Sequence, residues 1–276
     1  MFRPSMRTQT LKRLKLEENL RRDIQMGSFE VHYQPQIELS TGKIVEMEAL
    51  VRCWGNPSHR LMMPSEFIQI AEETGLIVPI GERVLEEACR QASKWREQQL
   101  TPPKMTICVN LSMRQLQDPY LVDKVERALW QASLDANNLK LEITETAVME
   151  DEQHVIGVLR NLKALGVQLS LDDFGRGYSS LNYVKDLPVD SLKIDKSFID
   201  GLGEDPVNDA IVRVIVDFAH TLDLKVTAEG VENGRQVASS TAVRCDLAQG
   251  FYFSKPLRSE AAGELAATNP SWWVPR

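Results

Sequence analysis

Seven short apolar runs in this sequence each carry a carboxylate, an amide or a lysine near the C-terminal end. A polar side chain within a strand-like run is costly to bury unless it has a partner or a ligand. One such group has a packing explanation, but seven in equivalent places indicate a common site. The positions are Glu48, Asn110, Glu142, the pair Asp172 and Asp173, Lys193, Glu229 and Gln249.

The alternation of side chains along a strand places these polar groups on one face of each run. Leu169 and Leu171 share one face of their run, whereas Asp172 lies on the other. Lys193 likewise lies opposite Leu192. If the apolar faces pack under helices, the polar faces must converge on one polar interior.

Strand-like and helix-like patterns alternate along the chain, and this alternation is typical of a parallel sheet covered by helices. The predicted strands are 29–38, 45–53, 104–111, 139–146, 166–173, 191–195, 225–230 and 245–250. The predicted helices are 64–73, 79–99, 119–133, 150–164, 178–185, 205–221 and 233–241. Eight strands with intervening helices predict an α/β fold, a closed (β/α)8 barrel of the TIM type, which commonly takes about 250 residues.

The first two predicted strands are an exception to this alternation. Residues 40–43 alone separate them, which is too short for a helical crossover between parallel strands. The pair should therefore form an antiparallel hairpin. We expect a modified barrel in which one strand runs against the others.

Composition and charge agree with a single enzyme-sized domain. The chain of 276 residues is 43% hydrophobic and 26% charged, and its formal net charge of −7 argues against binding to a nucleic-acid polymer. The four cysteines are widely spaced with no CxxC, which favours reduced core thiols over zinc ligands or disulfides. Neither a membrane span nor a signal peptide is evident. We expect a cytoplasmic protein, or the cytoplasmic part of a larger or membrane-associated one.

Three segments are expected along the chain. Residues 1–26 are basic and carry a helical pattern that includes Leu14 and Ile24, so we predict a linker helix there. A helix lying on a membrane surface is the alternative interpretation of this segment. Residues 27–260 form the barrel, and residues 261–276 form a C-terminal tail.

Several longer motifs resemble those of one known family. In order, they read VHYQPQI, EALVRCW, VNLS, EITET, DDFGRGYSSL, LKIDKSF, TAEGVE and QGFYFSKPL. From about residue 12 to about residue 258, the chain is similar to the EAL-domain family of cyclic di-GMP phosphodiesterases. The resemblance implies a modified (β/α)8 barrel with one antiparallel strand, and hydrolysis of cyclic di-GMP to linear pGpG with magnesium or manganese.

The resemblance also implies two metal ions per active site. Oxygen ligands suit Mg²⁺ and Mn²⁺, and the polar groups here are carboxylates and an amide. Ca²⁺ is expected to inhibit. The implied ligands are Glu48, Asn110, Glu142 and Asp172 for one ion, and Asp172, Asp173 and Glu229 for the other.

Further roles follow from the same resemblance. Lys193 and Glu229 are alternatives for the group that activates water. Gln34 and Arg52 would contact the substrate, with Arg52 as a clamp on the phosphate that is not cleaved. A salt bridge at the rim is the alternative for Arg52. The residues expected to support the ligands are Glu145, which steadies the loop after the paired aspartates, Glu232 and Gln249.

Three functions compete. The first is an active phosphodiesterase, and the second is a non-catalytic cyclic di-GMP receptor on the same fold. The third is an unrelated barrel metalloenzyme, similar to an enolase, with Lys193 as base. All implied ligand positions are filled, which favours catalysis, and the continuous motifs disfavour the third function. The family also implies a homodimer through residues 179–185, after the DDFGRG loop, and further regulatory domains in the full-length protein.

Overall fold

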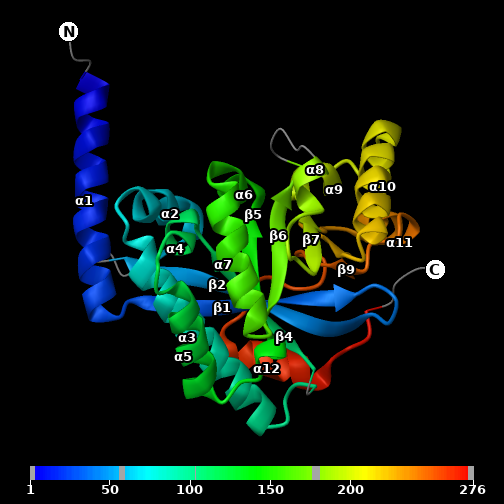
Figure 1. Cartoon of the computed structure of the whole chain (residues 1–276), viewed down its shortest axis with the longest axis horizontal. Helices are drawn as coiled ribbons and strands as arrows, with labels where there is room; N and C mark the ends of the chain where they lie inside the picture. Colours follow the sequence, from blue (N-terminus) through cyan, green and yellow to red (C-terminus); the bar gives the residue numbers. More distant parts are fainter. Residues whose placement is uncertain (1–3, 56–59, 103, 176–180, 273–276) are drawn as a thin grey trace.

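A closed sheet surrounded by helices forms the body of the molecule (Figure 1). The computed structural model describes residues 4–55, 60–102, 104–175 and 181–272. The strands are β1 (Phe29–Glu38), β2 (Lys43–Gly55), β3 (Arg60–Met62), β4 (Thr106–Leu111), β5 (Leu139–Thr144), β6 (Gln168–Phe174), β7 (Ser191–Ile194), β8 (Lys225–Ala228) and β9 (Leu247–Ala248).

Most of the helices lie between successive strands, as the sequence predicts. They are α1 (Pro4–Met26), α2 (Pro64–Glu73), α3 (Ile77–Glu97), α4 (Met113–Leu116), α5 (Leu121–Ala132), α6 (Glu145–Glu150), α7 (Glu152–Ala164), α8 (Leu181–Val184), α9 (Lys196–Ile199), α10 (Pro206–Thr221), α11 (Gly234–Ala242) and α12 (Ser259–Thr268). A 3-10 turn, Ala136–Asn138, precedes β5.

The pairing of the strands confirms a closed barrel with one reversed strand. β2 and β4 to β9 pair in parallel, each with the next, while β1 closes the sheet by pairing antiparallel with β2 and with β9. The short strand β3 was not predicted. It pairs antiparallel with the far end of β2 and extends the sheet beyond the barrel. Three residues carry too little pattern to be recognised as a strand.

The predicted strand faces are confirmed in the middle of the barrel. Leu169 and Leu171 of β6 are buried, as are Leu192 and Ile194 of β7. The opposite faces of these strands carry polar groups that are also buried, including Lys193. Because both faces are covered, the polar interior must satisfy its own hydrogen bonds and charges.

Helix α12 differs from the expected C-terminal tail. It begins at Ser259, before the predicted tail boundary, and lies across the lower side of the barrel in Figure 1. Trp95 donates from Nε1 to the carbonyl oxygen of Ser259. A Cβ on Gly263 would lie 2.6 Å from the same indole nitrogen, so the glycine permits this close approach. The segment carries small residues and few large apolar ones, so its helical signal in the sequence is weak.

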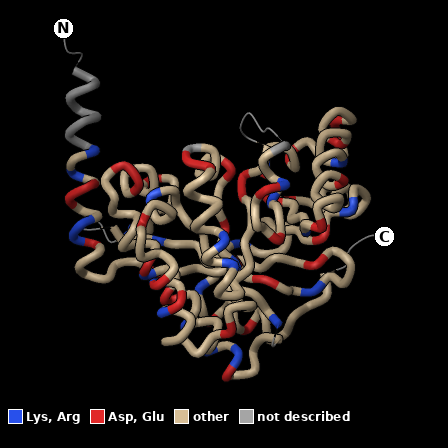
Figure 2. Tube along the Cα trace, in the orientation of Figure 1, with Lys and Arg blue, Asp and Glu red and all other residues tan. Residues whose placement is uncertain are grey.

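Helix α1 agrees with the expected N-terminal helix and projects beyond the body (Figure 1). Leu20 and Asp23 anchor it, since both are fully buried, and Arg13 pairs with Glu73 of α2. Figure 2 shows acidic and basic positions interspersed along the trace. Among the described residues, no helix is both long and apolar enough to cross a membrane.

A buried ion pair between Lys140 of β5 and Glu46 of β2 lies inside the barrel. The two atoms Nζ and Oε1 are 2.5 Å apart, and the side chains are 3% and 8% exposed. Glu46 also accepts from the thiol of Cys108, at 3.4 Å. Removing one partner of such a pair leaves a buried charge without compensation.

Replacing Lys140 by methionine should therefore lower the free energy of unfolding by about 3–5 kcal/mol, as urea denaturation would measure. The matched control is Lys225→Met, because Lys225 is an exposed lysine at the start of β8. That variant should change stability by no more than about 0.5 kcal/mol. A loss below about 1 kcal/mol for Lys140→Met, which is typical of exposed pairs, would contradict the burial argument.

Candidate active site

Lys193 lies at the centre of a buried cluster of carboxylates. Its Nζ is 2.7 Å from Glu229 Oε1, 2.8 Å from Glu142 Oε2, 3.6 Å from Asp172 Oδ1 and 3.7 Å from Glu48 Oε2. These residues come from β7, β2, β5 and β6 and from the residue after β8. All stand toward the C-terminal end of the parallel strands, where barrel enzymes hold their active sites.

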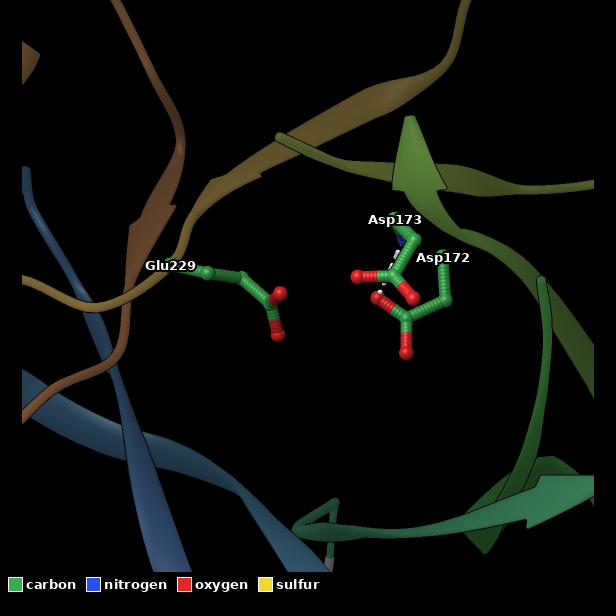
Figure 3. Close-up of side chains that lie close together, drawn as sticks. All are labelled: Asp172, Asp173 and Glu229. Atoms are coloured by element: carbon green, nitrogen blue, oxygen red, sulfur yellow. Dashed lines mark hydrogen bonds between the residues drawn. The ribbon is translucent and has the colours of Figure 1, made fainter. Parts of the chain in front are cut away.

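Asp172 and Asp173 occupy a bulge near the end of β6. The pairing of β6 with β7 shifts register between Leu171 and Phe174, and Asp173 has a φ of 55°. The backbone N–H of Asp173 donates to Asp172 Oδ1 at 2.8 Å. Figure 3 shows the two carboxylates side by side and facing Glu229. A regular strand would send consecutive side chains to opposite faces, so the bulge brings both to the same site.

Side-chain amides hold the carboxylate of Glu48. Asn110 Nδ2 donates to Glu48 Oε1 at 2.7 Å, and Gln249 Nε2 donates to Glu48 Oε2 at 2.5 Å. Gln249 also donates to Gln34 Oε1, and Gln34 Nε2 donates to the carbonyl oxygen of Ser254. The structure therefore brings Gln249 and Asn110 against Glu48, and it places Gln34 next to Gln249.

Arg52 is a buried cation further along β2. It is 4% exposed, and its Nη1 donates to the carbonyl oxygen of Val51 at 2.8 Å. Burial lowers the pKa of Arg52, and the charge of Glu48 opposes that effect. Within the described part of the chain, Arg52 forms no salt bridge, so the alternative of a rim salt bridge finds no support there.

Negative charge exceeds positive charge in this cluster. Burial by itself would lower the pKa of Lys193, but the surrounding carboxylates raise it well above its usual range. Burial raises the pKa of Glu142 to about 8, with Lys193 opposing the increase and the charges of Glu48 and Asp172 adding to it. The site thus holds more carboxylates than the ammonium group of Lys193 can neutralise.

The donor set fits divalent metal ions. One carboxylate oxygen from each of Asp172, Asp173 and Glu229 lies within 4.8 Å of the others. Mg²⁺ and Mn²⁺ prefer such oxygen ligands, and a divalent ion would offset the excess negative charge. Glu48, Asn110 and Glu142 lie beside this group and offer further oxygens.

Comparison with known proteins identifies the family. The model of the EAL domain matches residues 17–256, which is most of the chain. This chain belongs to the EAL-domain family. It is 42% identical over 259 residues to the bifunctional diguanylate cyclase/cyclic di-GMP phosphodiesterase MucR of Pseudomonas aeruginosa, covering 94% of this chain and 37% of MucR.

One further relative and one solved structure support the same family assignment. It is 36% identical over 261 residues to the cyclic di-GMP phosphodiesterase PdeR of Escherichia coli, covering 95% of this chain and 39% of PdeR. The solved structure of the PaMucR phosphodiesterase in complex with cyclic di-GMP superposes with a TM-score of 0.85 at 42% identity, covering 90% of this chain and 99% of that one. The chain spans about two fifths of the length of these curated relatives.

Glu145 and Glu232 are the other two residues that the sequence predicts to support the ligands. Glu145, at the start of α6, accepts from the backbone N–H of Gly175 at 3.0 Å, so it contacts the loop as expected. Glu232 pairs with Lys196 at the surface, three residues after Glu229. Of the expected loop and dimer segment, residues 176–180 lie outside the described part of the chain.

The sequence analysis did not predict Gln36 of β1, which contacts Glu142 of the cluster. Its Nε2 donates to Glu142 Oε1 at 3.5 Å and lies 3.7 Å from the sulfur of Cys108. Gln36 shares its strand face with Gln34, two residues earlier, so strand alternation was the signal that could have found it. Gln36 and Lys193 therefore approach different oxygens of Glu142.

Proposed function

We propose that this EAL domain hydrolyses one phosphodiester bond of cyclic di-GMP to give linear pGpG, with two Mg²⁺ or Mn²⁺ ions. The observation that carries the proposal is the convergence of five carboxylates, Asn110 and Lys193 at the C-terminal end of the barrel. The relatives MucR and PdeR, both named as cyclic di-GMP phosphodiesterases, support the same substrate. Free cysteines fit a reducing compartment, so we assign the activity to the cytoplasm.

The proposed ligands divide into two groups that share Asp172. Two divalent ions, when bound, supply positive charge to the phosphoryl oxygens and lower the pKa of water. Gln249 and Asn110 fix the orientation of Glu48 by hydrogen bonds. One ion would be held by Glu48, Asn110, Glu142 and Asp172, and the other by Asp172, Asp173 and Glu229.

The protein's own residues orient the substrate and move the proton. Arg52 is a buried guanidinium that can bind the phosphate that is not cleaved. In the register of the hairpin, Gln34 lies opposite Glu48, whereas Arg52 lies opposite Glu30. Lys193 Nζ and Glu229 Oε1 are 2.7 Å apart. The two are alternatives for the group that accepts the proton of the attacking water, and Lys193 can do so only in its neutral form. The water oxygen forms a bond to phosphorus while the bond to the 3′ oxygen breaks, and that oxygen takes up a proton.

The test is incubation of the purified protein with cyclic di-GMP and Mg²⁺, followed by chromatography of the nucleotides. The proposal expects pGpG to accumulate with time and protein concentration.

The second candidate function, a non-catalytic receptor, is favoured instead if folded protein binds cyclic di-GMP yet forms no pGpG with either Mg²⁺ or Mn²⁺. The only support for the receptor hypothesis is that every contact proposed here would also serve to bind cyclic di-GMP.

We also propose that the domain acts as a homodimer within a longer protein that carries regulatory domains. Helix α10 exposes Val207, Ile211 and Val214, which are 66%, 40% and 60% exposed. Their spacing places them on one face of the helix. Figure 1 shows α10 beside α9 and near α8, the described part of the expected dimer segment. A second copy of this chain would cover that apolar face.

Specific activity should therefore fall when the protein is diluted below its dimerisation constant. Ile211→Asp should shift the protein to monomer in sedimentation velocity and lower its specific activity at the same total concentration. The matched control is Trp130→Asp on α5, which also replaces an exposed apolar side chain. Activity that does not depend on concentration, in a protein shown to be monomeric, would refute the proposal.

A further inference from the structure

A second polar layer lies inside the barrel, next to the candidate metal ligands. Each of its members lies two positions from a residue of the site on the same strand: Gln36 on β1, Glu46 on β2, Cys108 on β4 and Lys140 on β5. In the register of the sheet, Gln36 lies opposite Glu46. Cys108 likewise lies opposite Lys140. All four are at most 6% exposed. Such interior layers are commonly apolar, and buried charges are costly, so a polar layer calls for a physical reason.

Gln36 joins this layer to the carboxylate cluster. Its Nε2 donates to Glu142 Oε1 at 3.5 Å and to Cys108 Sγ at 3.7 Å. A side-chain amide carries two N–H groups, so one is available for each acceptor. Lys193 Nζ donates to the other oxygen of Glu142, Oε2, at 2.8 Å. Gln36 and Lys193 therefore hold the carboxylate of Glu142 by both of its oxygens, and each oxygen keeps a further lone pair for a metal ion.

The ion pair between Glu46 and Lys140 sets the direction of these hydrogen bonds. Lys140 Nζ donates to Glu46 Oε1 at 2.5 Å, and Cys108 Sγ donates to Glu46 Oε2 at 3.4 Å. Burial and the charge of Glu46 raise the pKa of Cys108 well above its usual range, so the thiol keeps its hydrogen. A thiol has one hydrogen, and once Glu46 accepts it the sulfur offers only lone pairs to Gln36.

The orientation of the Gln36 amide follows from its two neighbours. A side-chain amide can present either its oxygen or its nitrogen, and the surrounding network decides between them. The carboxylate of Glu142 and the sulfur of Cys108 both act as acceptors here. The nitrogen of Gln36 must therefore face them, because its oxygen would meet two groups that donate nothing.

We propose that Gln36 is a positioning residue for Glu142, and that Cys108 and the ion pair fix the orientation of the Gln36 amide. The network then holds Glu142 in place before a metal ion arrives, as hydrogen bonds to metal ligands commonly do. That Glu142 binds metal rests on the proposed function, whereas the link from Cys108 to Gln36 does not. The polar layer thereby acquires a role in the site as well as in stability.

The first test follows the side-chain amide of Gln36 by ¹⁵N nuclear magnetic resonance, in the full chain without metal or nucleotide. Gln36→Met identifies the signal by removing it. Cys108→Ala takes away an acceptor, so the proton that faces the sulfur should move upfield. Cys108→Ser keeps a donor and an acceptor and should move it less. The matched control is Cys89→Ala on α3, also fully buried, which should leave the signal unchanged. An unchanged signal in Cys108→Ala would overturn the link.

The second test measures Mn²⁺ affinity by electron paramagnetic resonance. Gln36→Met has a similar size and lacks the amide, and it should weaken Mn²⁺ binding about three- to tenfold, the range for one net hydrogen bond. The matched control is Gln91→Met, because Gln91 is a buried glutamine of α3, outside the barrel interior. It should keep the parental affinity. Cys108→Ala should weaken Mn²⁺ binding by a smaller factor than Gln36→Met.

The two tests fail in different ways. Unaltered Mn²⁺ affinity in Gln36→Met, with the parental protein binding the ion, would overturn the positioning of Glu142. A parental protein that binds no Mn²⁺ would refute the proposed metal site and the positioning role with it. The link from Cys108 to Gln36 would then still stand on the amide signal of the metal-free protein.

Discussion

Replacing Lys193 by alanine should lower the rate of cyclic di-GMP hydrolysis about 10²- to 10⁴-fold, the range for loss of a group that handles protons or charge in the transition state. Its ammonium group lies within 3.7 Å of four carboxylates from four other parts of the barrel. Removing it takes away a proton-handling group and also the cation that orders Glu142 and Glu229. The measurement is the rate of pGpG formation at saturating metal and nucleotide.

Binding and control variants separate this effect from unfolding. The Lys193→Ala protein should still bind cyclic di-GMP, because Arg52 and Gln34 are unchanged. Glu229→Gln, which preserves shape, should also lose turnover while retaining nucleotide binding. Lys225→Ala removes an exposed lysine from the next strand and should keep the parental rate. Near-parental turnover in Lys193→Ala would mean that the assigned role is wrong.

Removal of divalent metal should abolish the formation of pGpG, and Mg²⁺ or Mn²⁺ should restore it. Four carboxylates surround the ammonium group of Lys193 and Asp173 adds a fifth to the site, so the site lacks positive charge for an anionic phosphodiester. Ca²⁺ should bind and support little turnover, since it is larger and less demanding in coordination geometry. The measurement is product formation after chelation and after addition of each ion.

Glu48→Ala distinguishes a metal ligand from a proton carrier. This variant should lower bound Mn²⁺ as well as rate, whereas Lys193→Ala should lower rate with metal still bound. Elemental analysis of the dialysed proteins would measure the bound metal. Full turnover in chelated protein, or equal rates with Ca²⁺ and Mg²⁺, would be incompatible with the proposed metal site.

The position of Lys193 shows why much of the site was predictable from sequence. A lysine in phase with an acidic residue, opposite Leu192 and Ile194, must point into the barrel if the apolar face packs under helices. The same reasoning predicts the interior positions of Glu142 and Asp172. The reversed strand β1 was predictable too, because residues 40–43 leave no room for a crossover.

Other features depend on contacts that no local pattern records. Asp173 would face away from Asp172 in a regular strand, and the bulge that turns it depends on pairing with β7. Helix α12 forms because small residues approach Trp95, a residue more than 160 positions earlier in the chain.

One measurement tests the central claim most directly. The protein is incubated with cyclic di-GMP and Mg²⁺ in water enriched in ¹⁸O, and the nucleotides are examined by mass spectrometry. Hydrolysis at this site predicts pGpG that carries one ¹⁸O atom in its terminal phosphate, and none from the Lys193→Ala protein over the same time. Unchanged cyclic di-GMP, in a protein that binds both the nucleotide and Mg²⁺, would contradict the claim.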